Sequence, residues 1–393
     1  MLEIKGKYAT AICYASVVED EAITQIRRMC DHEFTAGSRI RIMPDVHSGV
    51  GCTIGTTMTI VDKVVPNIVG VDIGCGMYTV ELGQVDIDFE RVDEAAHYIP
   101  SGKNVWEGRQ ERFDLTELRC YRALKDTKRL ERSLGTLGGG NHFIEIDVSE
   151  NGTKFLVIHS GSRNLGLQVA NHYQQLAVDL NLGKEELFAA REELIRTYKE
   201  QGRRKEIQKE LKDPTIPADL CYLYGSFMED YLHDVEICQR FARRSLEKMA
   251  EIILQRTGME AQSAFHTIHN YINVDERILR KGAIAAHEGE LVLIPINMRD
   301  CSVLARGRGN AEWNYSAPHG AGRLMSRSKA RETLDLEADR ATMAGVYTTS
   351  VNERTIDEAP MVYKSLEDII DVIRDSVDVI EVLKPIYNFK ASD

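Results

Sequence analysis

Short segments rich in β-branched residues, separated by glycines, fill the chain between about residues 36 and 83. Glycines at such short intervals allow tight turns but interrupt any long helix, so we expect consecutive strands here. The predicted strands read RIRIMPDV, CTIGTTMTIV, NIVGVDI and MYTVEL. Further strands are expected at Phe143–Val148, at Lys154–His159 and in ELVLIPINM, residues 290–298. A β-sheet core is therefore the main constraint on the fold.

From Leu167 to Thr257 the sequence is typical of helices that have a heavily charged face. Only Asp213–Pro217 interrupts this helical pattern. More helices are expected toward the C-terminus. No repeat, low-complexity tract or Pro/Ser-rich linker marks a domain boundary. We therefore predict an α+β fold made of one domain over residues 1–393. It has a glycine-rich β-sheet core, a helical insert at about 167–257 and flanking helices.

Composition narrows the classes of function. The net charge of −12 argues against a generally basic surface that coats nucleic acid, although it leaves room for a local basic groove. No apolar run approaches the roughly 18 residues that span a bilayer. The N-terminal segment has acidic residues where a signal peptide would have its apolar stretch. The eight cysteines stand singly, without a CxxC pair. We expect a cytoplasmic protein with no membrane segment.

The histidines carry the clearest functional signal. Five of the eleven lie in short polar or glycine-rich strings at the ends of predicted strands. Strand ends and loops are where a rigid scaffold positions chemistry, whereas a core histidine usually lies inside an apolar run. The five are His47, His142, His159, His269 and His319.

The string VGVDIGCGM, residues 69–77, is a candidate metal site. Asp72 and Cys75 are three residues apart, and Gly74 and Gly76 free the backbone to take positive φ, so both side chains can converge. Carboxylate and thiolate are good metal ligands, and a thiolate can bridge two ions. In isolation the string favours a tight turn with a capping aspartate and a buried thiol.

Two other histidine strings leave the arrangement open. FHTIHNYIN places His266 and His269 three apart, which predicts both on one helical face, with one of the two structural. In LGGGNHFIEI, a strand beginning at Asn141 would put Asn141 and Glu145 on one face and His142 on the other. One face could then hold a nucleotide and the other a metal ligand.

Two loops have the composition of phosphate-binding sites. APHGAGRLMSR, residues 317–327, sets His319 between a proline and two glycines ahead of a predicted helix, whose first N–H groups can receive a phosphate. FLVIHSGSRNLG, residues 155–166, predicts a second strand–loop–helix cradle. The fingerprints GxGxxG, GxxxxGK[ST], GxSxG and HExxH are absent. The remaining Asp, Cys and His ligands with two phosphate loops favour metal-assisted phosphoryl chemistry.

Taken together, six strings resemble the RtcB family of RNA-splicing ligases, in that family's order and over most of the chain. They are MPDVHSGVGCTIG, VGVDIGCGM, LGGGNHFIEI, VIHSGSRNLG, HNYI and HGAGRLMSR. The resemblance implies an RtcB-like fold and an enzyme that joins RNA 2′,3′-cyclic phosphate or 3′-phosphate ends to 5′-hydroxyl ends. It also implies GTP and two Mn²⁺ ions as cofactors, in RNA repair or tRNA splicing, with an accessory activator protein as a possible partner.

The resemblance assigns roles to residues. The manganese ligands would be Asp72, Cys75, His142, His159 and His269, with Cys75 bridging the two ions. His319 would be the nucleophile that attacks the α-phosphorus of GTP and carries the guanylyl group to the RNA 3′-phosphate. Metal-activated water would first open cyclic ends. The guanylate-binding positions would be Asn141, Glu145, Ser316, Gly320, Gly322, Tyr363 and Lys390.

One departure from the family pattern motivates an alternative. Where many members read PGSMG, this chain reads PINMRD, residues 295–300. A chain that had lost guanylate binding could act as a metal-dependent phosphodiesterase, which opens cyclic RNA ends without joining them. A non-catalytic protein that binds RNA ends is a third reading, and neither of these two needs His319. Because the net charge is negative, RNA would need a local basic patch, for which Arg163, Arg323 and Arg327 are the candidates.

Overall fold

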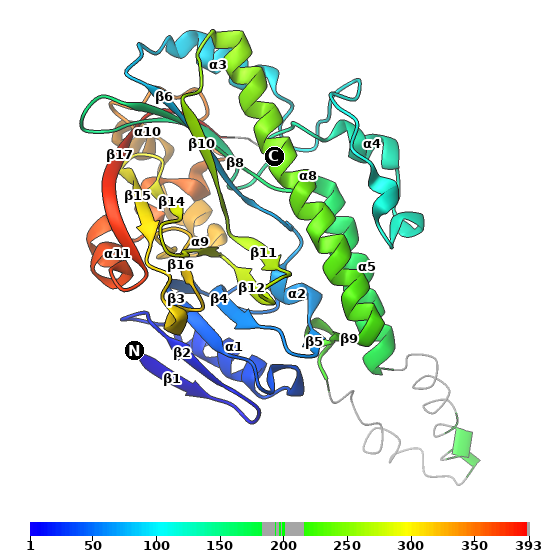
Figure 1. Ribbon diagram of the computed structural model, residues 1–393. Coiled ribbons are helices and arrows are strands. Elements are labelled where there is room, and N and C mark those ends of the chain that lie inside the picture. Colours follow the sequence, from blue (N-terminus) through cyan, green and yellow to red (C-terminus); the bar gives the residue numbers. More distant parts are fainter. Residues whose placement is uncertain (183–192, 194–195, 198, 201–215, 391–393) are drawn as a thin grey trace.

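The computed structural model describes residues 1–182, 193, 196, 197, 199, 200 and 216–390. Within them the chain forms two separate, largely antiparallel sheets, with long helices along one side (Figure 1). The predicted α+β class is confirmed. None of the described helices is long and apolar enough to cross a membrane.

A six-stranded sheet occupies the end of the molecule that carries the N-terminus (Figure 1). All its pairings are antiparallel except that between its second and third strands. In spatial order the strands are β1 Leu2–Lys5, β2 Thr10–Cys13, β3 Ile40–His47, β4 Ile54–Thr59, β12 Ile278–Lys281 and β11 Asn270–Asn273.

A seven-stranded antiparallel sheet forms the other half. In spatial order its strands are β10 Ser263–Ile268, β6 Gly76–Gly83, β8 Lys154–Ser160, β7 Phe143–Val148, β17 Val377–Lys390, β15 Cys301–Gly307 and β14 Leu291–Asn297. Two small ladders complete the β structure, namely β13 Ala283–Ala285 with β16 Ser316–Pro318, and β5 Lys63–Val64 with β9 Leu223–Tyr224.

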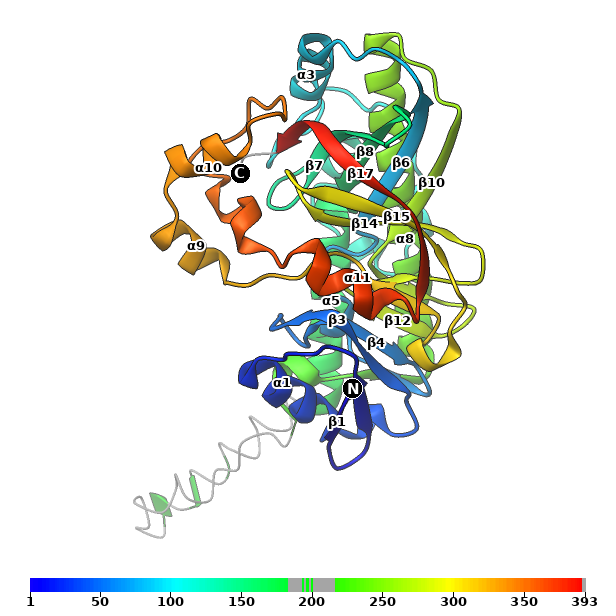
Figure 2. The same cartoon turned by 90° about the vertical axis from the view of Figure 1, so that its left-hand side faces the viewer.

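The helices cover the sheets from two sides. Figure 2 shows α8 on one side of the seven-stranded sheet and the segment with α9, α10 and α11 on the other. The helix bounds are α1 Asp20–Cys30, α2 Pro66–Val69, α3 Phe89–Tyr98, α4 Thr127–Arg132, α5 Arg163–Leu182, α8 Gly225–Thr257, α9 Arg327–Thr333, α10 Leu336–Thr342 and α11 Leu366–Ile373.

Alternation of side chains buries both faces of the seven-stranded sheet. Ile144 and Ile158 point to a core that includes Leu246 and Met249 of α8. Their neighbours Phe143 and Val157 point the opposite way, into a second apolar cluster with residues of β14, β15 and β17. A larger core joins the six-stranded sheet to α1, α5 and α8. Helix α8 therefore fixes the two sheets relative to each other.

Most predicted strands occur, and two sequence interpretations are wrong. NIVGVDI is not a strand, because Pro66 begins the short helix α2 and a turn follows. FHTIHNYIN is not helical but forms β10 and β11. Helices α5 and α8 lie within or overlap the segment 167–257 that was expected to be helical, and most of 183–215, including Asp213–Thr215, lies outside the described residues.

Candidate active site

Four adjacent strands bring three of the histidine strings together at one edge of the seven-stranded sheet, namely the edge that is formed by the ends of these strands. In the order β10-β6-β8-β7, Gly76 at the start of β6 lies opposite both Ile268 and Ser160. Cys75 immediately precedes Gly76, and His269 immediately follows Ile268. His159 lies opposite Phe143, the first residue of β7, which His142 precedes. Antiparallel register alone therefore collects one thiol and three imidazoles at one edge.

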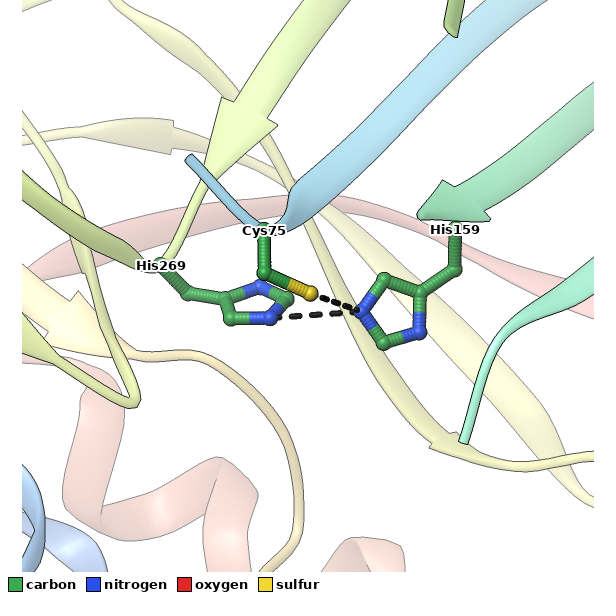
Figure 3. Close-up of side chains that lie close together, drawn as sticks. All are labelled: Cys75, His159 and His269. Carbon is green, nitrogen blue, oxygen red and sulfur yellow. Dashed lines mark hydrogen bonds between the residues drawn. The ribbon is translucent and has the colours of Figure 1, made fainter. Parts of the chain in front are cut away.

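Their donor atoms lie close together, and Figure 3 shows the side chains of Cys75, His159 and His269 pointing toward one another. The sulfur lies 3.3 Å from Nε2 of His159 and 3.6 Å from Nε2 of His142. The Nε2 atoms of His159 and His269 are 3.2 Å apart, and Oδ2 of Asp72 is 3.1 Å from Nε2 of His142. Two groups of three potential ligands result, Cys75–His159–His269 and Asp72–Cys75–His142. They share Cys75, as the predicted bridging role requires.

Backbone carbonyls fix which ring nitrogen faces this centre. Nδ1–H of His142 donates to the carbonyl of Leu137 over 2.9 Å, and Nδ1–H of His159 donates to that of Asn141 over 3.0 Å. Each ring therefore presents a bare Nε2 to the sulfur, the usual arrangement of metal-binding histidines. Oδ1 of Asp72 is buried and has no hydrogen-bond partner. These residues fit a pair of metal ions.

The electrostatics of the cluster without metal point the same way. Burial lowers the pKa of His159 to about 3 and, together with the neighbouring imidazoles, holds that of His269 well below its ordinary value. Burial and the Asp72 carboxylate raise the pKa of the Cys75 thiol well above its usual range. Burial opposes ionisation of Asp72, but His142 lowers its pKa overall. The rings of His159 and His269 are thus neutral donors, and the Cys75 thiol must lose a proton when metal binds.

Glycines clear the space around Asp72. A Cβ on Gly161 would lie 2.1 Å from Oδ1 of Asp72, so only glycine admits the carboxylate there. Gly74 has the predicted positive φ of +77°, but Gly76 does not. The constraint at Gly76 is close packing, because a Cβ there would lie 2.7 Å from the backbone of Ile268.

His319 stands next to the cluster, with its ring centroid 5.0 Å from that of His269. Its Nδ1 lies 2.6 Å from Oδ2 of Asp45, a fully buried carboxylate on β3 that also accepts a hydrogen bond from the His319 backbone N–H. The carboxylate therefore holds the proton on Nδ1 and leaves Nε2 with its lone pair. Sequence reasoning did not assign Asp45, although the residue lies in the string MPDVHSGVGCTIG.

The loop after His319 is shaped by contact with β3. Gly322 has φ +79°, and a Cβ there would lie 2.8 Å from the Asp45 carbonyl oxygen. The helix predicted to follow directly begins only at Arg327, as α9. Before it, the Arg323 guanidinium donates to the Asp357 carbonyl, the Glu358 carboxylate and the Tyr363 hydroxyl. The His319 loop therefore does not offer a helix N-terminus to a phosphate.

A cavity of about 350 Å³ opens beside His319. Its walls include most of the residues predicted to bind guanylate, together with the PINMRD segment as far as Met298. The predicted residues that line it are Asn141, Glu145, Gly320, Gly322, Tyr363 and Lys390. Ser316 is buried outside this lining, where its hydroxyl donates to the Asn314 carbonyl and accepts from Nε–H of Arg280.

Buried carboxylates organise the cavity wall. Glu358 accepts hydrogen bonds from the Tyr363 hydroxyl at 2.5 Å and from Nζ of Lys390 at 2.9 Å. Burial would raise its pKa, but the charges of Lys390 and Arg327 lower it to about 2. Glu145 accepts from Nδ2 of Asn388, its cross-strand neighbour, and burial with the nearby Asp147 raises its pKa well above the ordinary value.

Three further predictions of sequence analysis have structural outcomes. Of the two histidines in FHTIHNYIN, His266 is outside the ligand groups, stacks on Tyr78 and lies 3.1 Å from the Glu247 carboxylate. Arg323 and Arg327 line the cavity. Arg163 does not, and its guanidinium donates to the Gly102 carbonyl. Sequence reasoning missed Asp45, although it lies in the string MPDVHSGVGCTIG, and it missed Glu358 and Asn388, which lie in none of the six strings.

The chain is similar to known proteins over most of its length. The family described as tRNA-splicing ligase RtcB matches residues 25–121 and 114–391. An RNA-splicing ligase RtcB of Escherichia coli (strain K12) is 32% identical over 391 residues, covering 88% of each chain. A tRNA-splicing ligase RtcB of Aeropyrum pernix is 26% identical over 431 residues, covering 84% of this chain and 83% of its own. The chain therefore belongs to the RtcB family and is an RNA ligase with a site suited to metal ions.

Proposed function

We propose that this ligase joins RNA ends bearing a 2′,3′-cyclic phosphate or 3′-phosphate to 5′-hydroxyl ends, through a guanylyl group carried on Nε2 of His319. GTP would be the guanylyl donor and two Mn²⁺ ions the metal cofactor. The proposal treats residues 1–393 as one ligase domain. The named relatives act as RNA-splicing or tRNA-splicing ligases, which supports RNA repair or tRNA splicing as the setting.

One observation carries this proposal, namely the 2.6 Å contact between Asp45 and Nδ1 of His319. Attack of Nε2 on phosphorus makes the ring cationic, and a buried carboxylate on the opposite nitrogen stabilises that charge. Hydrolysis of a cyclic phosphate or simple binding of RNA ends needs no such pair. The phosphodiesterase alternative is therefore not favoured.

The cavity residues support a role in holding guanylate. The Lys390 ammonium group has three N–H bonds, so it can donate to the nucleotide while it also donates to Glu358. Tyr363, which donates to the same carboxylate, offers a hydroxyl group. Gly320 leaves the His319 loop without a side chain where the nucleotide phosphate would approach. Glu145 lies on β7, the strand next to the one that carries Lys390, and its carboxyl group is suited to the N–H donors of a guanine edge. Asn141, at the start of β7, lines the side nearest the metal ligands.

The five ligand residues would hold the metal ions, with Cys75 between them. When bound, the ions would neutralise phosphate charge and lower the pKa of a water molecule for opening cyclic ends. Thiolate and imidazole ligands ordinarily favour zinc over manganese. Manganese is proposed on the family resemblance, and metal-dependent activity is the direct test of it.

The terminal phosphate of the RNA would meet Arg323 and Arg327, which line the cavity on the side of the His319 loop. Both guanidinium groups already pair with Glu358 in the protein alone. A phosphate would therefore compete with this carboxylate for them. An accessory activator protein and a cytoplasmic location stay predictions.

The testing experiment mixes the purified protein with Mn²⁺ and α-labelled GTP, denatures it and measures label on the protein. We expect label on the wild type and none on His319→Ala. Opening of a 2′,3′-cyclic phosphate should persist in His319→Ala, because the ligand cluster remains. Absence of label on the wild type, with cyclic ends still opened, would replace this proposal with the phosphodiesterase.

A further inference from the structure

His47 borders the same cavity as His319 and has no part in the chemistry described so far. It is the last residue of β3, two residues beyond Asp45, and its Cα partner on β4 is Ile54. The register of these strands shifts between Ile42 and His47. Neither of the two groups of potential metal ligands includes His47.

A single residue, Asp45, sets the ring states of His47 and His319. The Asp45 carboxylate holds Nδ1 of His319, and its backbone carbonyl lies 3.0 Å from Nδ1 of His47. His47 therefore donates Nδ1–H to that carbonyl and keeps Nε2 as a free proton acceptor. The charged and titratable groups that act on the ring are Asp45, His319 and Arg323. Burial is the largest influence and lowers the pKa of His47, so the ring is neutral at neutral pH.

The sealing step of the proposed reaction needs a proton acceptor. When the 5′-hydroxyl oxygen attacks the activated 3′-phosphate, its proton must leave. Most of the other basic groups that line the cavity are engaged, and His319 is the guanylyl carrier of the earlier steps. His159 and His269 face the metal-ligand centre, Glu358 is held by Lys390 and Tyr363, and Glu145 receives Asn388. Among the described residues of the lining, His47 offers an unengaged Nε2, as does His319 once its guanylyl group has left. His47 has no role in the earlier steps, so a proton on its ring does not block the nucleophile for the next guanylylation.

We propose that Nε2 of His47 is the general base that takes the proton from the RNA 5′-hydroxyl during sealing. The O5′–P bond forms as the bond between the RNA phosphate and GMP breaks. GMP leaves with the electron pair of that bond, and the O5′ proton passes to Nε2 of His47. The imidazolium then returns its proton to solvent. This inference rests on the proposed function, because it assigns a residue to that reaction's last step.

The test measures two single-turnover rates on the same preparation. One is guanylylation of the protein by α-labelled GTP. The other is sealing of an RNA whose 3′-phosphate already carries GMP, supplied with a 5′-hydroxyl RNA. In His47→Gln we expect the ratio of the sealing rate to the guanylylation rate to fall by roughly 100-fold, within the usual contribution of a general base. Adding free imidazole to His47→Gly should restore sealing in proportion to its concentration.

His233→Gln is the matched control, since this histidine lies on α8, contacts the Glu117 carbonyl and is not among the residues that line the cavity. Its rate ratio should equal that of the wild type. If His47→Gln seals as fast as the wild type relative to guanylylation, or if imidazole has no effect on His47→Gly, the assignment of His47 is wrong. Absence of label on the wild-type protein would instead refute the proposed function itself, so the two failures are distinct. If His47→Gly does not fold, the ratio in His47→Gln decides.

Discussion

Replacing Asp45 with asparagine tests the proposed nucleophile most directly. The side chain is fully buried, and its Oδ2 lies 2.6 Å from Nδ1 of His319. Asparagine keeps the shape but removes the charge, and its amide can donate to Nδ1 and so move the ring proton to Nε2. The loss then has two parts. A charge-assisted hydrogen bond contributes about 1.5–3 kcal/mol, and the wrong tautomer removes the nucleophilic lone pair.

Together these effects predict a fall of roughly 10³-fold in the rate of His319 guanylylation, equivalent to about 4 kcal/mol. The assay is single-turnover labelling with α-labelled GTP at saturating metal. Metal content and thermal unfolding of the variant serve as controls, because the ligand cluster does not include Asp45. If Asp45→Asn with normal metal content labels within about threefold of the wild type, the carboxylate does not govern His319 and the reasoning fails.

Three other perturbations have expected outcomes. Cys75→Ser should lower the metal stoichiometry measured by mass spectrometry or elemental analysis, because both ligand groups contain this sulfur; two tightly bound ions in the variant would contradict the bridging role. Since burial and Asp72 hold the pKa of the Cys75 thiol well above its usual range, metal binding should release its proton, and calorimetry should show apparent affinity rising about tenfold per pH unit near neutrality. The pKa of Glu358 is lowered to about 2 in the folded protein from an ordinary 4.5, so its contribution of roughly 3 kcal/mol is present above about pH 4.5 and is lost as pH falls toward 2. Glu358→Gln should therefore be less stable at pH 7 and show a shallower loss of stability in acid, as followed by urea unfolding, and equal acid profiles would remove Glu358 as the cause.

The strands that carry the site could be predicted because their sequences are locally decisive. Phe143–Val148 is a strand with the predicted bounds, and β8 extends the predicted Lys154–His159 by one residue. Both are β-branched or aromatic runs that end at glycines or turns. NIVGVDI has the same composition but follows Pro66, whose fixed φ starts a helical turn. The spacing of His266 and His269 matched a helix, although β10 pairs with β6 and places only His269 at the metal-ligand edge.

Partners distant in sequence were beyond prediction from the residues themselves. Asp45 and His319 are 274 residues apart, and only the contact between β3 and β16 brings them together. Glu358 gathers Lys390, Arg323 and Arg327 from three segments, yet its own surroundings in sequence resemble an ordinary helical turn. The Ser316 assignment came from resemblance, whereas the nearby buried Arg280 engages its hydroxyl away from the cavity. Long-range packing decides such roles.

Four histidines of the site differ in the hydrogen-bond partner of Nδ1, and this difference matches the charge that each ring must carry in the proposed reaction. His142 and His159 donate Nδ1–H to carbonyls, which fix a tautomer without adding charge and direct Nε2 to the metal-ligand centre. His319 becomes cationic when it receives a phosphoryl group, and its Nδ1 faces a buried carboxylate where the other three face carbonyls. His47 has a carbonyl, which orients the ring but stabilises its cation only weakly. A base in this position can accept a proton during sealing and release it again before the next turnover, because burial of the ring disfavours the imidazolium more than Asp45 favours it.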